Sequence, residues 1–139
     1  MGNKPILYEK ISGVGIITLN RPEKRNAITS ATGAEWASMI NQAREDRDVK
    51  VLVVTGKETS FCAGSDFFQE IQNESMKSFP YPLTDHIKFW EKTAHQLIRA
   101  VDKFDKPYIC ALMERLQAME WTWPACATSG SYRTRPGLP

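Results

Sequence analysis

Apolar and polar positions alternate near the start of the chain in a pattern that predicts two short strands. Residues 5–20, PILYEKISGVGIITLN, carry apolar side chains on both sides of Ser12 and Gly13. Serine and glycine are common in tight turns, so the two strands are expected to form a hairpin. The following residues, NRPEKRNAI, are mostly polar and open with Asn-Arg-Pro, which predicts a loop.

Two later segments have the spacing of amphipathic helices. In residues 29–48 the apolar positions fall at i, i+3, i+4 and i+7, namely at Trp36, Met39, Ile40 and Ala43. In residues 84–107 one apolar stripe continues until Pro107 stops the helix. That stripe consists of Ile87, Trp90, Ala94, Leu97, Ile98 and Val101. A shorter helix is expected after Asp66, which is a suitable N-cap.

Two further segments are predicted strands. Residues 49–56, VKVLVVTG, form a nearly continuous β-branched run, which is typical of a parallel strand covered on both faces. Residues 107–112, PYICAL, begin another buried strand. The order strand–strand–helix, strand–helix–helix, strand predicts an α/β layout in which helices cover a sheet.

Composition and charge narrow the class of protein. A chain of 139 residues, 42% hydrophobic and 24% charged, is typical of one soluble domain. The net charge of +2 gives no basis for nucleic-acid or membrane-surface binding, and no apolar run is long enough to cross a bilayer. Three cysteines without metal-ligand spacing, and no targeting signal, predict an intracellular protein. The cytoplasm is the expected compartment, with mitochondrion and peroxisome left open.

Residues 51–67, VLVVTGKETSFCAGSDF, are the best candidate for a binding site. A P-loop is rejected, because Val51 and Glu58 stand where that motif needs glycine and serine or threonine. The small residues at 63–65 allow a ligand to approach the backbone, and N–H groups before a helix point outward. The backbone N–H of Ser65 is therefore a candidate donor to an oxyanion. On composition alone, a tight turn with Asp66 as a helix cap explains the same residues more simply.

The other reactive side chains do not form a catalytic or metal-binding pattern. Cys62 has no histidine near it in sequence, so it is interpreted as a packed thiol. His86 and His95 are nine residues apart on one predicted helix and therefore face different directions. No metal site is predicted.

Three segments, taken together, resemble the enoyl-CoA hydratase/isomerase (crotonase) family. They are GVGIITLNRPEKRNAI, VKVLVVTGKETSFCAGSDF and LIRAVDKFDKPYICA, in the family's order and spacing. The resemblance covers about residues 5–111 and overrides the turn-only interpretation of residues 60–67. It implies an α/β fold: a crotonase-like spiral of strand–strand–helix units, truncated here. Residues 1–111 would be the N-terminal part of an acyl-CoA-binding domain.

The resemblance also implies a site for an acyl-CoA thioester. In the loop of residues 21–27, RPEKRNA, Lys24 or Arg25 would meet phosphate and Ala27 would touch pantetheine. Ser65 would supply one of two backbone N–H donors to the thioester oxygen. Backbone groups of four neighbours would hold adenine and pantetheine: Ala63, Gly64, Asp66 and Phe67. Coenzyme A is part of the substrate, so no separate cofactor is expected, and the family suggests a homotrimer or hexamer.

From residue 112 onward the resemblance stops. The family's second N–H donor comes from a glycine-rich turn after the next strand, and its acid–base carboxylates come later; neither motif is present in residues 112–139 as written. That segment is interpreted as an aberrant tail, read in a shifted frame. A genuinely divergent tail is the alternative.

The resemblance implies an enzyme that acts on an enoyl-CoA thioester through an enolate stabilised in an oxyanion hole. This is chemistry of fatty-acid β-oxidation, carried out by a hydratase (a lyase) or a double-bond isomerase. The 139-residue chain itself is expected to be inactive or impaired. The alternative is a non-catalytic fragment that binds coenzyme A or associates with other subunits.

Overall fold

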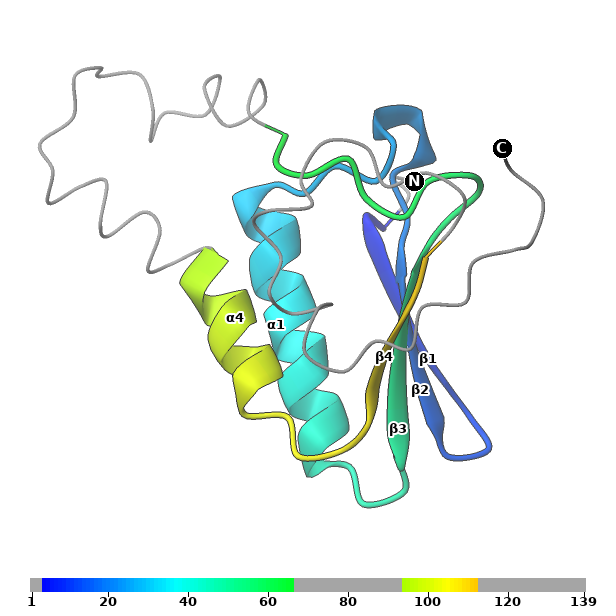
Figure 1. The fold of residues 1–139 in the computed structure, drawn as a ribbon, viewed down its shortest axis with the longest axis vertical. Coiled ribbons are helices and arrows are strands. Elements are labelled where there is room, and N and C mark those ends of the chain that lie inside the picture. The colour runs from blue at the N-terminus through cyan, green and yellow to red at the C-terminus, as the bar shows by residue number, and fades with distance from the viewer. Residues whose placement is uncertain (1–3, 67–93, 113–139) are drawn as a thin grey trace, which may run out of the picture.

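The computed structural model describes residues 4–66 and 94–112, which form a sheet with two α-helices side by side on one of its faces (Figure 1). The sheet has four strands in the order β1-β2-β3-β4. These are β1 (Ile6–Ile11), β2 (Val14–Leu19), β3 (Val51–Gly56) and β4 (Tyr108–Ala111). The helices are α1 (Ser30–Glu45) and α4 (Ala94–Asp102), with a short 3-10 helix η1 (Pro22–Lys24).

The predicted hairpin is confirmed. Strands β1 and β2 pair antiparallel, and the register ends where Ile11 faces Val14. The two residues between them, Ser12 and Gly13, have φ values of 49° and 84°. Two consecutive left-handed residues are typical of the tight turns whose twist matches that of the flanking strands.

Strand β3 is parallel to both of its neighbours, as its β-branched run predicts. The expectation that both faces are covered is wrong for the described residues. Leu52 and Val54 are fully buried, whereas Val51 and Val53 are half-buried. The reason is that successive side chains of a strand point to opposite faces, and α1 and α4 cover only one of them.

The core lies between that face and the two helices. Helix α1 begins after Thr29, whose side chain accepts a hydrogen bond of 3.2 Å from the N–H of Thr32. The predicted stripe of α1 faces the core, with Trp36 and Ile40 fully buried. Among the described helices, none is long and apolar enough to cross a membrane.

Two predictions for the second half need correction, and two fall outside the described residues. On α4, Leu97 is buried but Ile98 is 38% exposed, and Ala100 packs into the core in its place. Strand β4 was predicted to be buried, but only Tyr108 is buried and Ile109 is 49% exposed. The reason is that β4 is the last strand of the described sheet. Residues 84–93 of the predicted long helix, and the short helix after Asp66, lie outside the described residues.

Candidate functional site

Two loops leave the carboxyl ends of parallel strands at the same edge of the sheet. Leu19 and Gly56 are paired residues at the ends of β2 and β3. The N–H of Lys57 donates to the carbonyl oxygen of Leu19 at 2.9 Å, which joins the two loops where they begin. Carboxyl ends of parallel strands are where ligands bind in open α/β sheets.

The first loop, residues 20–29, is held in a compact shape by Asn26. This residue is 1% exposed and has φ 58°, a left-handed conformation that asparagine tolerates better than most residues. Its side-chain oxygen accepts from the N–H of Arg21 at 2.9 Å. Its side-chain amide donates to the carbonyl oxygens of Lys57 (3.0 Å) and Ser60 (2.6 Å) in the second loop. Asn26 therefore fixes both loops at once.

The second loop, residues 57–66, pairs with the first through its backbone. Ile28 and Ser65 form an isolated parallel β-bridge. In this bridge the N–H of Ile28 donates to Gly64 at 2.8 Å, and the N–H of Asp66 donates to Ile28 at 2.8 Å. A third bond joins the N–H of Ala63 to the carbonyl oxygen of Arg25 at 2.9 Å.

The hydrogen bonds leave one N–H of residues 63–66 unused within the described part of the chain. The N–H groups of Ala63 and Asp66 donate to the first loop, and that of Gly64 donates to the Cys62 sulfur at 3.2 Å. The N–H of Ser65 has no acceptor among residues 4–66 and 94–112. Because Gly64 and Asp66 bond toward Ile28, the N–H of Ser65 points to the opposite side, and Ser65 is exposed.

The structure brings the predicted site residues together on these two loops. Lys24 and Arg25 are exposed at the end of η1, Ala27 and Ala63 are half-buried, and Gly64 is buried with φ 96°. These lie on the two loops that the Ile28–Ser65 bridge joins. Phe67 lies outside the described residues.

Sequence reasoning missed the contacts that Asp66 makes beside this site. Its carboxylate accepts a hydrogen bond of 2.9 Å from the guanidinium of Arg21, and both side chains are largely buried. Arg21 also donates to the carbonyl oxygen of Ala27 at 2.7 Å. The sequence offered two signals for this contact: Arg21 lies just after the predicted second strand, and Asp66 lies at the end of the second loop. Asn26, in a sequence position typical of a left-handed turn, was a third.

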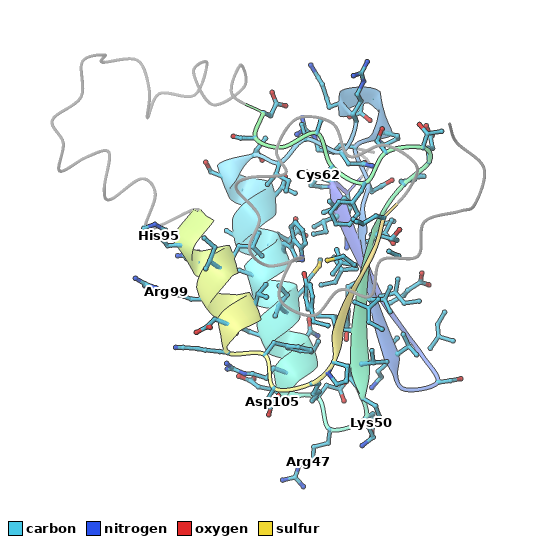
Figure 2. The ribbon with its side chains drawn as sticks, viewed as in Figure 1. Arg47, Lys50, Cys62, His95, Arg99 and Asp105 are labelled. Carbon is cyan, nitrogen blue, oxygen red and sulfur yellow. The ribbon has the colours of Figure 1, made fainter. Side chains whose placement is uncertain are left out.

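Cys62 has the environment of a packed thiol, as predicted. Burial raises the pKa of the Cys62 thiol, with a smaller opposing effect from the hydrogen bond of the Gly64 N–H. Figure 2 places Cys62 beside the sheet, whereas His95 lies on α4 and is exposed. The raised pKa argues against a nucleophilic role, and within residues 4–66 and 94–112 the hydrogen bonds of the Cys62 sulfur are to Gly64 and not to a base.

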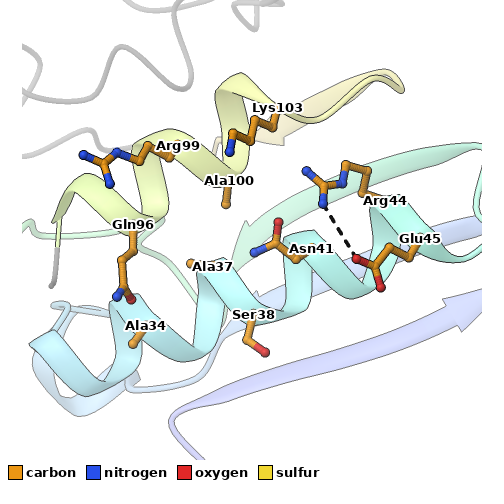
Figure 3. A pocket seen from close by; sticks show the side chains of 10 residues that line it. All are labelled: Ala34, Ala37, Ser38, Asn41, Arg44, Glu45, Gln96, Arg99, Ala100 and Lys103. Atoms are coloured by element: carbon orange, nitrogen blue, oxygen red, sulfur yellow. Dashed lines mark ion pairs between the residues drawn. The ribbon is translucent and has the colours of Figure 1, made fainter. Parts of the chain in front are cut away.

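A groove between α1 and α4 is separate from the two loops (Figure 3). Its volume is about 550 Å³, and it is lined only by residues of the two helices and Lys103 just beyond α4. Three of these are cationic, Arg44, Arg99 and Lys103, and Arg44 makes a 3.7 Å contact with Glu45. None of the predicted site residues lines this groove. Among the described residues, no cluster of three metal-binding side chains is present.

The chain is similar in sequence to known proteins. A family model described as enoyl-CoA hydratase/isomerase matches residues 9–113. A curated relative, the 1,2-epoxyphenylacetyl-CoA isomerase of Escherichia coli K12, is 33% identical over 107 residues, which are 77% of this chain and 39% of that protein. The chain therefore spans about two fifths of the length of this relative.

Solved structures agree in fold. An enoyl-CoA hydratase/isomerase from Xanthobacter autotrophicus Py2 superposes with a TM-score of 0.68 at 28% identity, over 81% of this chain and 39% of that one. Pseudomonas aeruginosa AtuE gives a TM-score of 0.67 at 26% identity, over 79% and 40%. The predicted crotonase-like fold and the resemblance carried by residues 5–111 are thereby confirmed. The chain belongs to the enoyl-CoA hydratase/isomerase family.

Proposed function

We propose that the two loops bind an acyl-CoA thioester, and that the backbone N–H of Ser65 is one of two donors to its carbonyl oxygen. The observation that carries this proposal is that the N–H of Ser65 has no acceptor in the described part of the chain, whereas the N–H groups of Ala63, Gly64 and Asp66 all have one. A donor held by the fold, rather than by the ligand, is preorganised for charge that develops during the reaction.

The chemistry proposed is formation of an enolate from an enoyl-CoA thioester. Negative charge grows on the thioester oxygen when an α-proton leaves or when water adds to the conjugated double bond. A donor aimed at that oxygen stabilises the transition state more than the ground state. Both a hydratase and a double-bond isomerase use this step, and neither needs a cofactor beyond the coenzyme A of the substrate.

The remaining predicted residues are proposed to hold the coenzyme A portion. Lys24 and Arg25 are exposed cations of the first loop, and the carbonyl oxygen of Arg25 binds the N–H of Ala63 in the second, which suits contact with phosphate groups. The N–H groups of Ala63, Gly64 and Asp66 already have acceptors. Contacts from this loop to adenine and pantetheine would therefore use carbonyl oxygens and van der Waals surface. Ala27 and Phe67 are proposed to contact the same ligand.

A second candidate function is a CoA-binding or subunit-associating fragment without turnover. It is favoured by an apolar surface on the sheet face opposite the helices, where Leu7, Ile11 and Ile109 are 39%, 53% and 49% exposed. Large apolar patches on a sheet commonly mark protein contacts. The described residues also supply only the Ser65 donor of the proposed pair, so the chain is expected to bind better than it catalyses. A homotrimer or hexamer remains a prediction from the family.

Hydration of crotonyl-CoA, followed beside a calorimetric titration with the same ligand, tests both candidates. Binding with turnover supports an enzyme, and binding without turnover supports the fragment. No heat of binding at millimolar crotonyl-CoA would contradict acyl-CoA binding and would leave only the subunit-associating fragment. Lys106→Met is a suitable control, because the Lys106 ammonium binds the carbonyl oxygens of Ala43 and Asp46 at the far end of α1.

A further inference from the structure

The guanidinium of Arg21, in the first loop, joins that loop to the second loop next to Ser65. Its Nη1 donates to the carbonyl oxygen of Ala27 at 2.7 Å, one residue before Ile28. Its Nη2 donates to the Asp66 carboxylate at 2.9 Å, one residue after Ser65. The residues that flank both members of the Ile28–Ser65 bridge are therefore bound by one planar group.

This contact is largely buried, unlike the other ion pairs of the described residues. The side chains of Arg21 and Asp66 are 14% and 9% exposed, whereas those of Lys10 and Asp46 are 39% and 30% exposed at a similar distance of 2.8 Å. Water screens a buried pair less, and a guanidinium holds its donors in a fixed plane. The buried pair therefore restricts the loop geometry more than an exposed pair of similar length.

The side-chain bonds by which Asn26 joins the two loops reach Lys57 and Ser60, at least five residues before Ser65. The Ile28–Ser65 bridge is isolated and does not extend into a strand ladder. Gly64, next to Ser65, has φ 96°, a conformation open to glycine but strained for other residues. Without a further restraint, the orientation of the Ser65 N–H would depend on a few backbone hydrogen bonds.

We infer that Arg21 and Asp66 are positioning residues that hold the Ser65 N–H in the direction of the thioester oxygen. The inference rests on the proposed function of Ser65. The pair also has an electrostatic role: Arg21 neutralises a carboxylate that stands one residue from the proposed oxyanion donor. With Arg21 removed, the charge of Asp66 would oppose negative charge developing on the thioester oxygen.

Three variants of the 139-residue chain test the two contacts separately. Arg21→Lys keeps the charge but loses the fork that reaches both acceptors. Asp66→Ala removes the carboxylate, and Asp66→Asn keeps an oxygen that accepts from Arg21. Lys10→Met is the control, because it breaks the exposed ion pairs of Lys10 with Asp46 and Asp48, at 2.8 and 3.3 Å, at the end of β1 away from the two loops.

Hydrogen–deuterium exchange of the ligand-free protein provides the first measurement. In Arg21→Lys and Asp66→Ala, the N–H groups of Ile28, Ala63 and Asp66 are expected to exchange at least about tenfold faster, through local opening. The exchange rate of the Leu52 N–H in β3 is expected to be the same in all variants and in the unaltered chain. Asp66→Asn and Lys10→Met are expected to exchange like the unaltered chain at the loops. Unchanged loop exchange in Arg21→Lys and Asp66→Ala overturns the inference whether or not the chain binds acyl-CoA.

Polarisation of a bound thioester provides the second measurement. The absorption band of cinnamoyl-CoA moves to longer wavelength when its carbonyl oxygen accepts hydrogen bonds. Arg21→Lys and Asp66→Ala are expected to lose about half or more of that shift, with dissociation constants changed by no more than about threefold. Asp66→Asn is expected to show the same shift as the unaltered chain, because its side-chain oxygen still accepts from Arg21. Equal shifts in all variants overturn the inference, whereas no binding by the unaltered chain overturns the proposed function and leaves the exchange result to decide the positioning role.

Discussion

Ile28 and Ser65 face each other in an isolated parallel bridge, and their pairing directs the N–H of Ser65 away from the loop that contains Ile28. The two bonds of the bridge are made by Gly64 and Asp66, the residues on either side of Ser65. Backbone groups of successive residues point to opposite sides of an extended segment. The pairing that fixes the second loop therefore leaves the Ser65 N–H without an acceptor among the described residues, on the side away from Ile28.

The first prediction separates the backbone of Ser65 from its side chain. Ser65→Ala is expected to leave the affinity and the absorption shift of bound cinnamoyl-CoA unchanged, because the proposed donor is the main chain. Ser65→Pro removes the N–H and is expected to abolish the shift. Loss of one such donor typically costs about 3 kcal/mol of transition-state stabilisation. Loss of the shift in Ser65→Ala, with loop exchange intact, would show instead that the hydroxyl is the functional group.

The hairpin, α1 and the parallel strand β3 were predictable because local patterns determine them. Ser12-Gly13 set the turn, and Trp36, Met39 and Ile40 gave the helix its period. The prediction that Ile98 belongs to the buried stripe was wrong. Leu97 and Ile98 are adjacent and apolar, so the sequence allows α4 to turn either of them toward the core, and packing against α1 buries Leu97 and Ala100. Tertiary contacts, rather than periodicity, decide such cases.

The site could be predicted only in part. The small residues 63–65 indicated close backbone approach, and the family resemblance assigned a role to Ser65. Neither indicated that Arg21 binds Asp66 across 45 positions of sequence, nor that Asn26 binds Lys57 and Ser60. These contacts arise because parallel strands bring two distant loops to one edge of the sheet, which a sequence pattern does not encode locally.

The second prediction concerns the buried amide of Asn26. Asn26→Ala removes the acceptor of the Arg21 N–H and the donor to two carbonyl oxygens. It is expected to lower the free energy of unfolding by about 3 kcal/mol, because buried polar groups would lose their partners. Urea denaturation measures this loss. Asn41→Ala in α1 is the matched control, with an expected change of less than about 0.5 kcal/mol; equal effects of the two variants would contradict the role of Asn26.

The third prediction contrasts two glycines. A Cβ at Gly56 would overlap the carbonyl oxygens of Ser60 and Phe61 and lie 2.7 Å from the Phe61 Cα, so Gly56→Ala is expected to destabilise by about 3 kcal/mol or more. A Cβ at Gly33, inside α1, would meet the Ile28 side chain at an ordinary 3.7 Å. Gly33→Ala is therefore expected to stabilise by about 0.5–1 kcal/mol. Thermal unfolding of both variants checks the opposite signs.

The fourth prediction concerns pH. Burial raises the pKa of the Cys62 thiol from its ordinary value of 9.0, so the folded protein favours the neutral thiol. The corresponding stability is fully present below pH 9.0 and is lost as pH rises through the pKa of the folded state. Between pH 7 and pH 10, the unaltered chain is expected to lose more stability than Cys62→Ser. Parallel pH profiles for the two proteins would contradict the burial of this thiol.

Iodoacetamide labelling gives an independent check of Cys62. At pH 8 the labelling rate of the Cys62 peptide is expected to be at least about tenfold slower in the folded protein than in urea, because the thiolate is the reactive form. Faster labelling in the folded protein would indicate an activated cysteine.

The last prediction concerns residues 112–139, and it uses the genetic code. The family match ends at residue 113, next to the point where the sequence changes character. When each codon is read from the third base of one residue and the first two of the next, four positions are forced. Met113–Glu114 and Met119–Glu120 give glycine, Trp121–Thr122 gives aspartate, and Trp123–Pro124 gives alanine.

The forced residues match the family's glycine-rich turn, which has glycines, and the following helix, which has an acidic and a small residue. The unforced codons permit the other residues of the turn. Codons 112–113 allow asparagine, 115–116 alanine and 117–118 glycine. We therefore expect the nucleotide sequence from codon 108 onward to encode an Asn-Gly-x-Ala-x-Gly-x-Gly turn in the shifted frame, in register with β4. Such a turn would supply the second oxyanion donor, and an aspartate in place of a glutamate at the acidic position would favour isomerase or other enolate chemistry over hydration. A stop codon soon after codon 111 in that frame would refute the shifted reading and leave a divergent tail.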